Sequence, residues 1–341
     1  MTTRDGAGTA YWIDHMVVGT NDMAAWVAWA VNAIGVVPSP LQGITTDAQK
    51  RNQPIASFLD IGDGSCHFGA FLQPENFPPS AGLGKGLPRY GFFVRPEDVD
   101  THLLRLEKHG IPHTGPVRTS AEGDDGTAVY FEDPDGNQFE FWAPDVMPEG
   151  AMEVSTEIGV GRVASAVYGS RDLQRSAAFC RDYFGLSPAD SSEIPEDTLV
   201  LPLAAGGRIV YNLTDEVDER LTGHGPWNAM HAALVVEDDV YMSNYIRLWE
   251  GVPEEPDDHH AQSREAQDAL PGRTGLHGSP AGRKWKEAYN RGDEIYDPDG
   301  HAYHFIGGLP RKGGSLATYA PKEQHEYLKD LTEAIAAGTL A

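Results

Sequence analysis

The tetrapeptide Asp-Pro-Asp-Gly occurs twice in this chain, at 133–136 and at 297–300, and each copy leads into a run rich in aromatic residues. Proline presets φ for a tight turn and glycine supplies a positive φ, so each copy predicts a turn before a strand. Four residues after each glycine, between two aromatic residues, stands a residue type that binds metals: Glu140 in the first copy and His304 in the second. The matched spacing indicates one supersecondary unit built more than once.

Further repeats of the same unit extend along the chain. A strand at 11–19 is followed by Asp22 and a helical stretch, and a strand at 162–169 is followed in the same way by Asp172. Aspartate is a favoured first residue of a helix, so both helices are expected to begin there. Short β-rich runs follow each helix, and two more strand–helix pairs complete the pattern. The sequence therefore predicts an α+β fold of four βαβββ units, at about 10–75, 88–145, 160–214 and 228–308.

Charge and composition limit the classes of partner. The formal net charge is −25, which argues against nucleic acid, because phosphate binding requires clustered lysine and arginine. No apolar stretch is long enough to cross a membrane, and the polar start does not resemble a signal peptide. The two cysteines, Cys66 and Cys180, are isolated and form no disulfide framework. We therefore expect a cytoplasmic protein that binds neither membranes nor nucleic acid.

The fourth unit contains a long polar insertion at about 251–291, rich in Asp, Pro, Gly and His. A segment of this length inside a compact domain is usually functional or disordered. An amphipathic helix is expected at about 321–337. The predicted organisation is an N-terminal domain of two units, a C-terminal domain of two units with the insertion, and a C-terminal linker and helix, at 1–150, 151–312 and 313–341.

Four βαβββ units with metal-binding residue types on their first and last strands resemble the vicinal oxygen chelate superfamily. Its members include glyoxalase I, fosfomycin-resistance proteins and type I extradiol dioxygenases. The resemblance covers about residues 10–308. It implies that units pair to curl mixed sheets into two cups with helices outside, each cup built to surround one divalent metal. Since members often form dimers, it also implies a homo-oligomer.

The resemblance assigns ligand positions on the first strands, at His15, Tyr90, Ser165 and His231, and on the last strands, at Glu140 and His304. If the units pair in sequence order, neither cup holds a complete set of ligands. If the first unit pairs with the fourth, one cup collects three histidines and the other keeps Tyr90, Glu140 and Ser165. We prefer this second pairing, which resembles enzymes that cleave hydroquinone rings. Glu140 is then expected to be a hydrogen-bonded carboxylate in a cup without metal.

The predicted metal ligands are therefore His15, His231 and His304. An all-histidine set departs from the two-histidine, one-carboxylate triad of non-haem Fe(II) oxygenases and leaves the full charge of the metal, which favours an anionic substrate. Imidazole suits several metals, so Fe(II) is the first expectation, and Zn(II), Mn(II), Co(II) and Ni(II) remain open. The open coordination positions that remain are typical of a catalytic site.

The favoured function is a ring-cleaving, extradiol-type dioxygenase that acts on a catechol- or hydroquinone-type substrate with O₂. The positions of the extradiol acid–base histidine and tyrosine are taken here by Trp285 and Glu294. We therefore expect substitutes from the insertion and its surroundings: His259, His260 or His277 as the acid–base residue, with Tyr289 or Tyr296. Of these we prefer His277 and Tyr296. Two alternatives stay open: a metal-dependent lyase, isomerase or hydrolase of the same superfamily, and a ligand-binding protein without catalysis.

Overall fold

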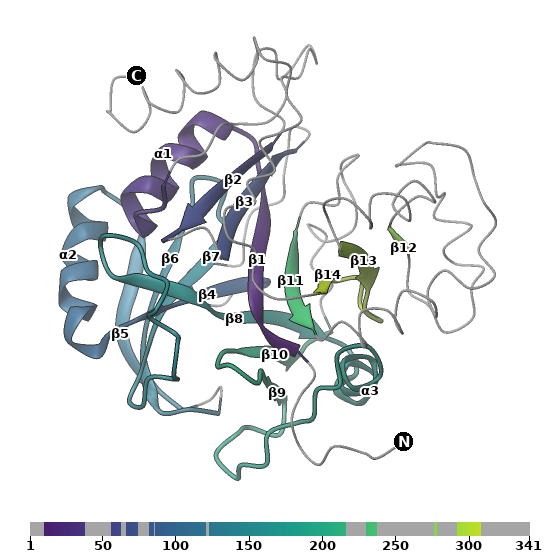
Figure 1. The fold of residues 1–341 in the computed structure, drawn as a ribbon. Coiled ribbons are helices and arrows are strands. Elements are labelled where there is room, and N and C mark those ends of the chain that lie inside the picture. Colours follow the sequence, from purple (N-terminus) through teal and green to yellow (C-terminus); the bar gives the residue numbers. More distant parts are fainter. Residues whose placement is uncertain are drawn as a thin grey trace, which may run out of the picture.

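A computed structural model gives the fold of the chain (Figure 1). It describes residues 10–37, 56–62, 66–73, 82–84, 86–120, 123–215, 230–236, 276–277 and 292–307. At residues 56, 276–277, 292–296 and 304–307 this description covers the backbone and not the side chains.

The described strands form one mixed sheet of fourteen strands, with four helical segments. Its main path runs β12-β13-β14-β11-β1-β8-β4-β7-β6-β5, with β3 and β2 added at β1, and β10 and β9 added at β8. The bounds of the strands are β1 Ala10–Thr20, β2 Ala56–Ile61, β3 Cys66–Leu72, β4 Arg89–Val94, β5 His113–Thr119, β6 Gly126–Glu132, β7 Gln138–Pro144, β8 Val160–Ser170, β9 Thr198–Pro202, β10 Arg208–Leu213, β11 His231–Val236, β12 Leu276–His277, β13 Gly292–Tyr296 and β14 Ala302–Gly307. The helical segments are α1 Met23–Ile34, η1 Pro96–Asp98, α2 Val99–Lys108 and α3 Leu173–Phe184.

The units pair in the second of the two ways considered from the sequence, with the first unit next to the fourth. β1 pairs antiparallel with β11, and β4 pairs antiparallel with β8, whereas β1 and β8 share a single residue pair. The first unit is thus joined to the fourth and the second to the third. We call the half of the sheet around β1 and β11 the first cup, and the half around β4 and β8 the second cup.

Helices α1 and α3 begin where the sequence predicted. The Asp22 side chain accepts a hydrogen bond from the amide of Ala25, and Asp172 caps α3 in the same way. Both helices end at a glycine in the left-handed region, Gly35 with φ 72° and Gly185 with φ 65°. The helix expected in the fourth unit and the C-terminal helix expected at 321–337 lie outside the described residues.

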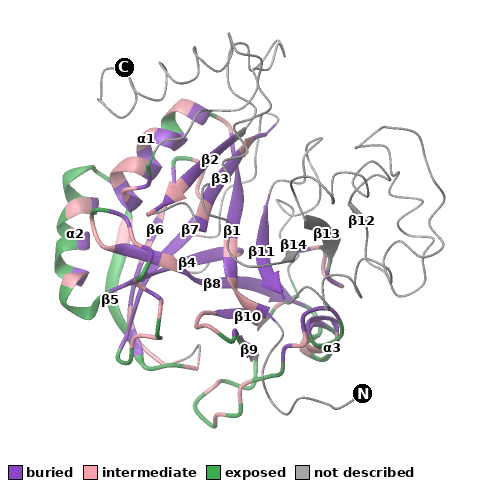
Figure 2. Ribbon diagram, viewed as in Figure 1, coloured by how far each residue is buried: buried purple, intermediate pink, exposed green. Residues whose placement is uncertain are grey.

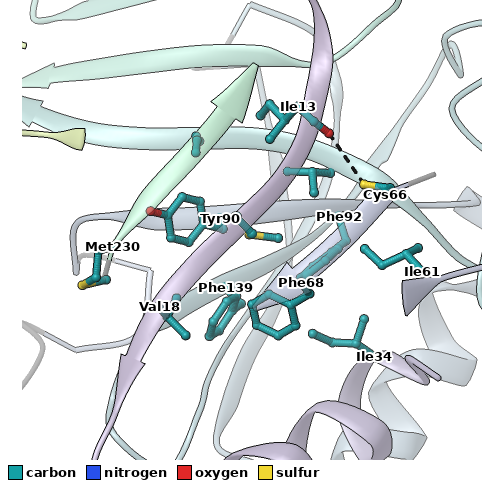
Figure 3. Close-up of a cluster of buried hydrophobic side chains, with 14 of the residues drawn as sticks. Ile13, Val18, Ile34, Ile61, Cys66, Phe68, Tyr90, Phe92, Phe139 and Met230 are labelled. Atoms are coloured by element: carbon teal, nitrogen blue, oxygen red, sulfur yellow. Dashed lines mark hydrogen bonds between the residues drawn. The ribbon is translucent and has the colours of Figure 1, made fainter. Parts of the chain in front are cut away.

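A large aromatic core lies between the sheet and helices α1 and α2. Phe68 and Phe139 have ring centroids 5.4 Å apart, and both pack against Trp29 of α1. Figure 3 shows this cluster, which also contains Tyr90 and Cys66. Figure 2 shows that the central strands are buried, whereas the outer face of α2 and much of β5 are exposed. None of the described helices has the length and apolar character needed to span a membrane.

Both Asp-Pro-Asp-Gly segments form the predicted turns and are built alike. In the first, the Asp133 side chain accepts hydrogen bonds from the amides of Asp135 and Asn137, at 2.9 and 2.8 Å. In the second, the Asp297 side chain accepts the equivalent two bonds, both at 2.9 Å. A glycine with positive φ completes each turn. The first aspartate of each motif therefore holds the turn together from inside.

The second aspartate of each motif binds the neighbouring unit. Asp135 accepts hydrogen bonds from the Thr20 hydroxyl and the amide of Asn21, where β1 leads into α1. Asp299 accepts the matching pair from Ser170 and the amide of Arg171, where β8 leads into α3. The turn of the second unit is thus anchored on the first unit, and that of the fourth unit on the third.

Candidate metal centre

Two of the three predicted ligands meet in the first cup. His15 on β1 and His231 on β11 have their Nε2 atoms 3.3 Å apart, with the ring planes inclined at 79°. His231 pairs with Val17, two residues beyond His15, so both imidazoles project from the same face of the sheet. The residues are 7% and 3% exposed. Strand register therefore brings together two imidazole nitrogens that are 216 residues apart in the sequence.

A carboxylate fixes the orientation of one of these rings. His15 Nδ1 donates a hydrogen bond of 2.7 Å to Asp14 Oδ2, and the two side chains are 9% and 14% exposed. With the proton of the neutral ring on Nδ1, the lone pair of Nε2 faces His231. Metal-binding histidines commonly donate their second nitrogen to a carboxylate in this way, which fixes the tautomer and raises the basicity of the ligand.

The spacing of the two nitrogens suits a shared cation. Two imidazole nitrogens bound at about 2.1 Å, at a near-tetrahedral angle, would lie about 3.4 Å apart. The observed separation is 3.3 Å. Among the side chains that the structure describes, no group of three His, Cys, Asp or Glu forms a complete set of ligands. The two histidines thus fit part of a metal site and require a third donor.

The backbone places the third predicted ligand in the same row of the sheet. His304 pairs with Ala233 across β14 and β11, and Ala233 pairs with His15 across β11 and β1. Residues paired in this way share one face of a sheet. The His304 side chain lies outside the described part of the chain, so its role as a ligand stays a prediction.

The predicted catalytic residues lie in the outer strands of the first cup. His277 of β12 pairs with Glu294 of β13, which in turn pairs with His304. Tyr296 of β13 pairs with Ala302. The side chains of His277 and Tyr296 also lie outside the described residues, and their catalytic roles remain predictions.

A further histidine, not predicted from the sequence, lies on the other side of His15. His67 of β3 is in register with His15 across the parallel β1–β3 pair. Its Nδ1 donates a hydrogen bond of 2.9 Å to Asp60 on β2, and its side chain is 13% exposed. The alternation of His67 with the core residues Cys66 and Phe68 places it on the cup face and was visible in the sequence.

The cup wall beside these histidines is apolar. Phe58 lies edge-on to His15, with ring centroids 6.1 Å apart, and also contacts Phe71. Val17, Phe58 and Phe71 form a small cluster of their own, separate from the core under the helices. This surface suits an aromatic or other flat apolar group.

The cysteines are unsuited to nucleophilic chemistry. Burial raises the pKa of the Cys66 thiol to about 12 and also raises that of Cys180. Because the thiolate is the reactive form, both residues act as core side chains.

The second cup holds an ion pair where a metal was not expected. Glu140 is 1% exposed, accepts a hydrogen bond of 2.9 Å from Arg89 Nε and a second of 2.7 Å from the Ser165 hydroxyl. The prediction that Glu140 is a hydrogen-bonded carboxylate in this cup is confirmed, as is its contact with Ser165. Arg89, which the sequence did not suggest, is its charged partner.

The placement of Tyr90 in this cup is wrong. Gly91, and not Tyr90, pairs with both Glu140 and Ser165. Tyr90 packs in the core under the helices (Figure 3), with its ring centroid 6.3 Å from that of Tyr168. A shift of one residue moves a strand side chain to the opposite face of the sheet. The error of one residue therefore placed Tyr90 on the cup face, whereas it lies on the core face.

Comparison with known proteins agrees with this architecture. Residues 12–141 match the model of the Glyoxalase/Bleomycin resistance protein/Dioxygenase superfamily, across the first two units. This match marks a similarity of the N-terminal part of the chain to this superfamily. No curated protein matches the sequence.

Solved structures with the same fold span almost the whole chain. A Bacillus subtilis protein named as a candidate dioxygenase has a TM-score of 0.58 and 15% identity, over 96% of this chain and 97% of its own. Glyoxalase I from Zea mays has a TM-score of 0.52 and 16% identity, over 94% and 95% of the two chains. At these identities the likeness shows the fold alone.

The family match gives the histidine pair a general chemical context. The superfamily consists mostly of metal-dependent enzymes, and its members bind divalent metals. In this chain, His15 and His231 of the first cup are described side chains that suit a divalent metal. The second cup, by contrast, has its carboxylate bound by an arginine.

Proposed function

We propose that the protein is a metal-dependent ring-cleaving dioxygenase for catechol- or hydroquinone-type compounds, with Fe(II) held by His15, His231 and His304. The observation that carries the proposal is the 3.3 Å approach of the two buried Nε2 atoms on β1 and β11. Bound at this place, Fe(II) would supply a redox-active positive centre for an aromatic diol and O₂. His304 joins the set because its backbone lies in the same row of the sheet.

His67 is suited to move the substrate proton. Its Nδ1 donates to Asp60, so in the neutral ring Nε2 carries the lone pair that can accept a proton. Paired strands lie about 4.8 Å apart, which places His67 directly beside His15. We therefore assign to His67 the removal of a proton from a phenolic hydroxyl, with the Asp60 carboxylate stabilising the imidazolium that forms. His277 and Tyr296 are proposed to contact the same substrate from the opposite side.

The apolar wall orients the ring and limits the access of water. Phe58, 9% exposed, stands edge-on to His15, and Phe71 and Val17 extend the surface. An aromatic substrate packed on this wall would direct its hydroxyl groups toward the histidines. Burial of apolar ring surface contributes about 25 cal/mol per Å² to binding, before the losses of association are subtracted.

The direct test is O₂ uptake by Fe(II)-loaded protein on a panel of catechols and hydroquinones. We expect uptake by the wild type, loss of bound iron and of uptake in His15→Ala and in His231→Ala, and little change in His109→Ala, whose histidine is exposed. His67→Gln should keep the iron and lose most of the turnover. Full iron loading without uptake on any compound would refute the ring-cleaving assignment.

A metal-dependent lyase, isomerase or hydrolase is the second candidate. It is favoured by the donor set, because His15 and His231 are both imidazoles and the expected third ligand is not the carboxylate found in most non-haem iron oxygenases. The metal in protein purified from cells separates the two: iron supports oxygen chemistry, and zinc or nickel supports Lewis-acid chemistry.

A further inference from the structure

The two cups can be compared residue by residue through the register of their strands. Arg89 pairs with Gln138 at the start of β4 and β7, and His231 pairs with Ala302 at the start of β11 and β14. In each cup the residue two positions further along pairs with the last-strand ligand position and with the first-strand position. The counterparts are therefore Arg89 with His231, Ser165 with His15, and Glu140 with His304.

The three second-cup residues contact one another closely. Both oxygens of the Glu140 carboxylate are taken, one by Arg89 Nε at 2.9 Å and the other by the Ser165 hydroxyl at 2.7 Å. Arg89 Nη1 also donates to the carbonyl of Gly84 at 3.3 Å, and its guanidinium carbon lies 5.1 Å from the centre of the Tyr130 ring. Arg89 is 5% exposed and Glu140 is 1% exposed. The guanidinium is thus held on several sides.

We infer that Arg89 is a built-in cation that takes the place of a metal in the second cup, and that Arg89 thereby decides which of the two cups can bind one. A buried carboxylate needs a compensating charge, because an isolated ion is strongly disfavoured away from water. The guanidinium supplies that charge permanently, since it does not lose its proton in proteins. The exclusion of metal from the second cup stands on these contacts alone, whereas a metal in the first cup rests on the proposed function.

Gly91 lets the backbone of β4 pass directly beside the ion pair. A Cβ added to Gly91 would lie 2.3 Å from Ser165 Oγ and 2.7 Å from Glu140 Oε1. The backbone of β4 therefore approaches the triad so closely that only glycine fits at position 91, and no side chain at this position could donate to Glu140 in place of Arg89. The charge beside Glu140 is thus supplied by Arg89.

The test counts Co(II) bound by a chain from which the first site has been deleted. We take His15→Ala with His231→Ala as the background and add Arg89→His, which places an imidazole at the counterpart of position 231. The added change should tighten Co(II) binding at least tenfold and produce the visible absorption of coordinated cobalt. Adding Arg89→Lys instead keeps a cation and should give no gain. Adding Glu140→Gln to the Arg89→His chain should abolish the gain.

Thermal unfolding gives a second, independent measurement on the same chains. The Arg89→His chain should lose stability without metal, because Glu140 is left uncompensated, and Co(II) should raise its Tm while leaving the Tm of the Arg89→Lys chain unchanged. The inference is overturned if the background already binds Co(II) in a manner that depends on Glu140. It is equally overturned if Arg89→His neither binds Co(II) nor gains stability from it. Absence of metal from the wild type would refute the proposed function and would not affect the inference about Arg89.

Discussion

Replacing Asp14 by asparagine tests whether the His15 imidazole is set up as a ligand. Asp14 Oδ2 lies 2.7 Å from His15 Nδ1, and the side chains are 14% and 9% exposed, so solvent screens the contact little. Asparagine keeps a hydrogen-bond acceptor and removes the negative charge, and a charge-assisted bond is roughly twice as strong as a neutral one. Loss of such a partner weakens metal binding by about 10- to 100-fold, or about 1.4–2.7 kcal/mol.

We therefore expect Asp14→Asn to weaken binding of Fe(II) or Zn(II) by roughly tenfold and Asp14→Ala by roughly a hundredfold, because alanine also releases the ring. The assay is competition for the metal with a chelator of known affinity, with circular dichroism to verify the fold. Asp60→Asn is the matched control: it removes the carboxylate of His67 and should leave metal affinity unchanged while shifting the pH profile of turnover. Equal metal affinity in wild type, Asp14→Asn and Asp14→Ala would refute the assignment of His15 as a ligand.

Three further predictions concern stability. Burial lowers the pKa of His102 to about 4, so protonation of this histidine favours the unfolded chain. The protein therefore loses stability as the pH falls from about 6.5 to about 4. Urea unfolding at pH 7 and pH 4.5 should show that His102→Leu removes up to about 3 kcal/mol of this loss. Asp135→Ala should cost about 1–3 kcal/mol in the same assay, because the Thr20 hydroxyl and the Asn21 amide lose the carboxylate that accepts from them; no change would contradict the anchoring role. Gly91→Ala should lower Tm clearly, because its Cβ would overlap buried atoms; an unchanged Tm would show that the second cup is loosely packed.

Much of the fold could be predicted because its signals are local. Asp22 and Asp172 provide side-chain acceptors for free helix amides, and the Asp-Pro-Asp-Gly turns require only their own four residues and the next. The pairing of the first unit with the fourth could also be predicted, because only that pairing gathers three histidines in one cup. The pairing was predicted from the residue types at the ligand positions, more than from the strength of the sequence repeat.

The remainder depended on register between distant strands, which no local signal sets. The sequence comparison gave Tyr90 and His231 as equivalent first-strand positions, and the strand pairing shifts the match by one residue, to Arg89. His67 was missed for a related reason. It becomes a neighbour of His15 only through the parallel β1–β3 pair, across 52 residues that include α1. Function in this fold is therefore decided by pairings that connect residues far apart in the chain.

Two kinds of contact close the four units into a ring. The sheet joins the first unit to the fourth and the second to the third, through β1–β11 and β4–β8. The Asp-Pro-Asp-Gly turns join the second unit to the first and the fourth to the third, through Asp135 and Asp299. Each unit is thus held by two different neighbours. The strands that carry His15 and His231 are fixed relative to each other both directly and around the ring, which explains how imidazoles from the two ends of the chain can keep a separation suited to a single ion.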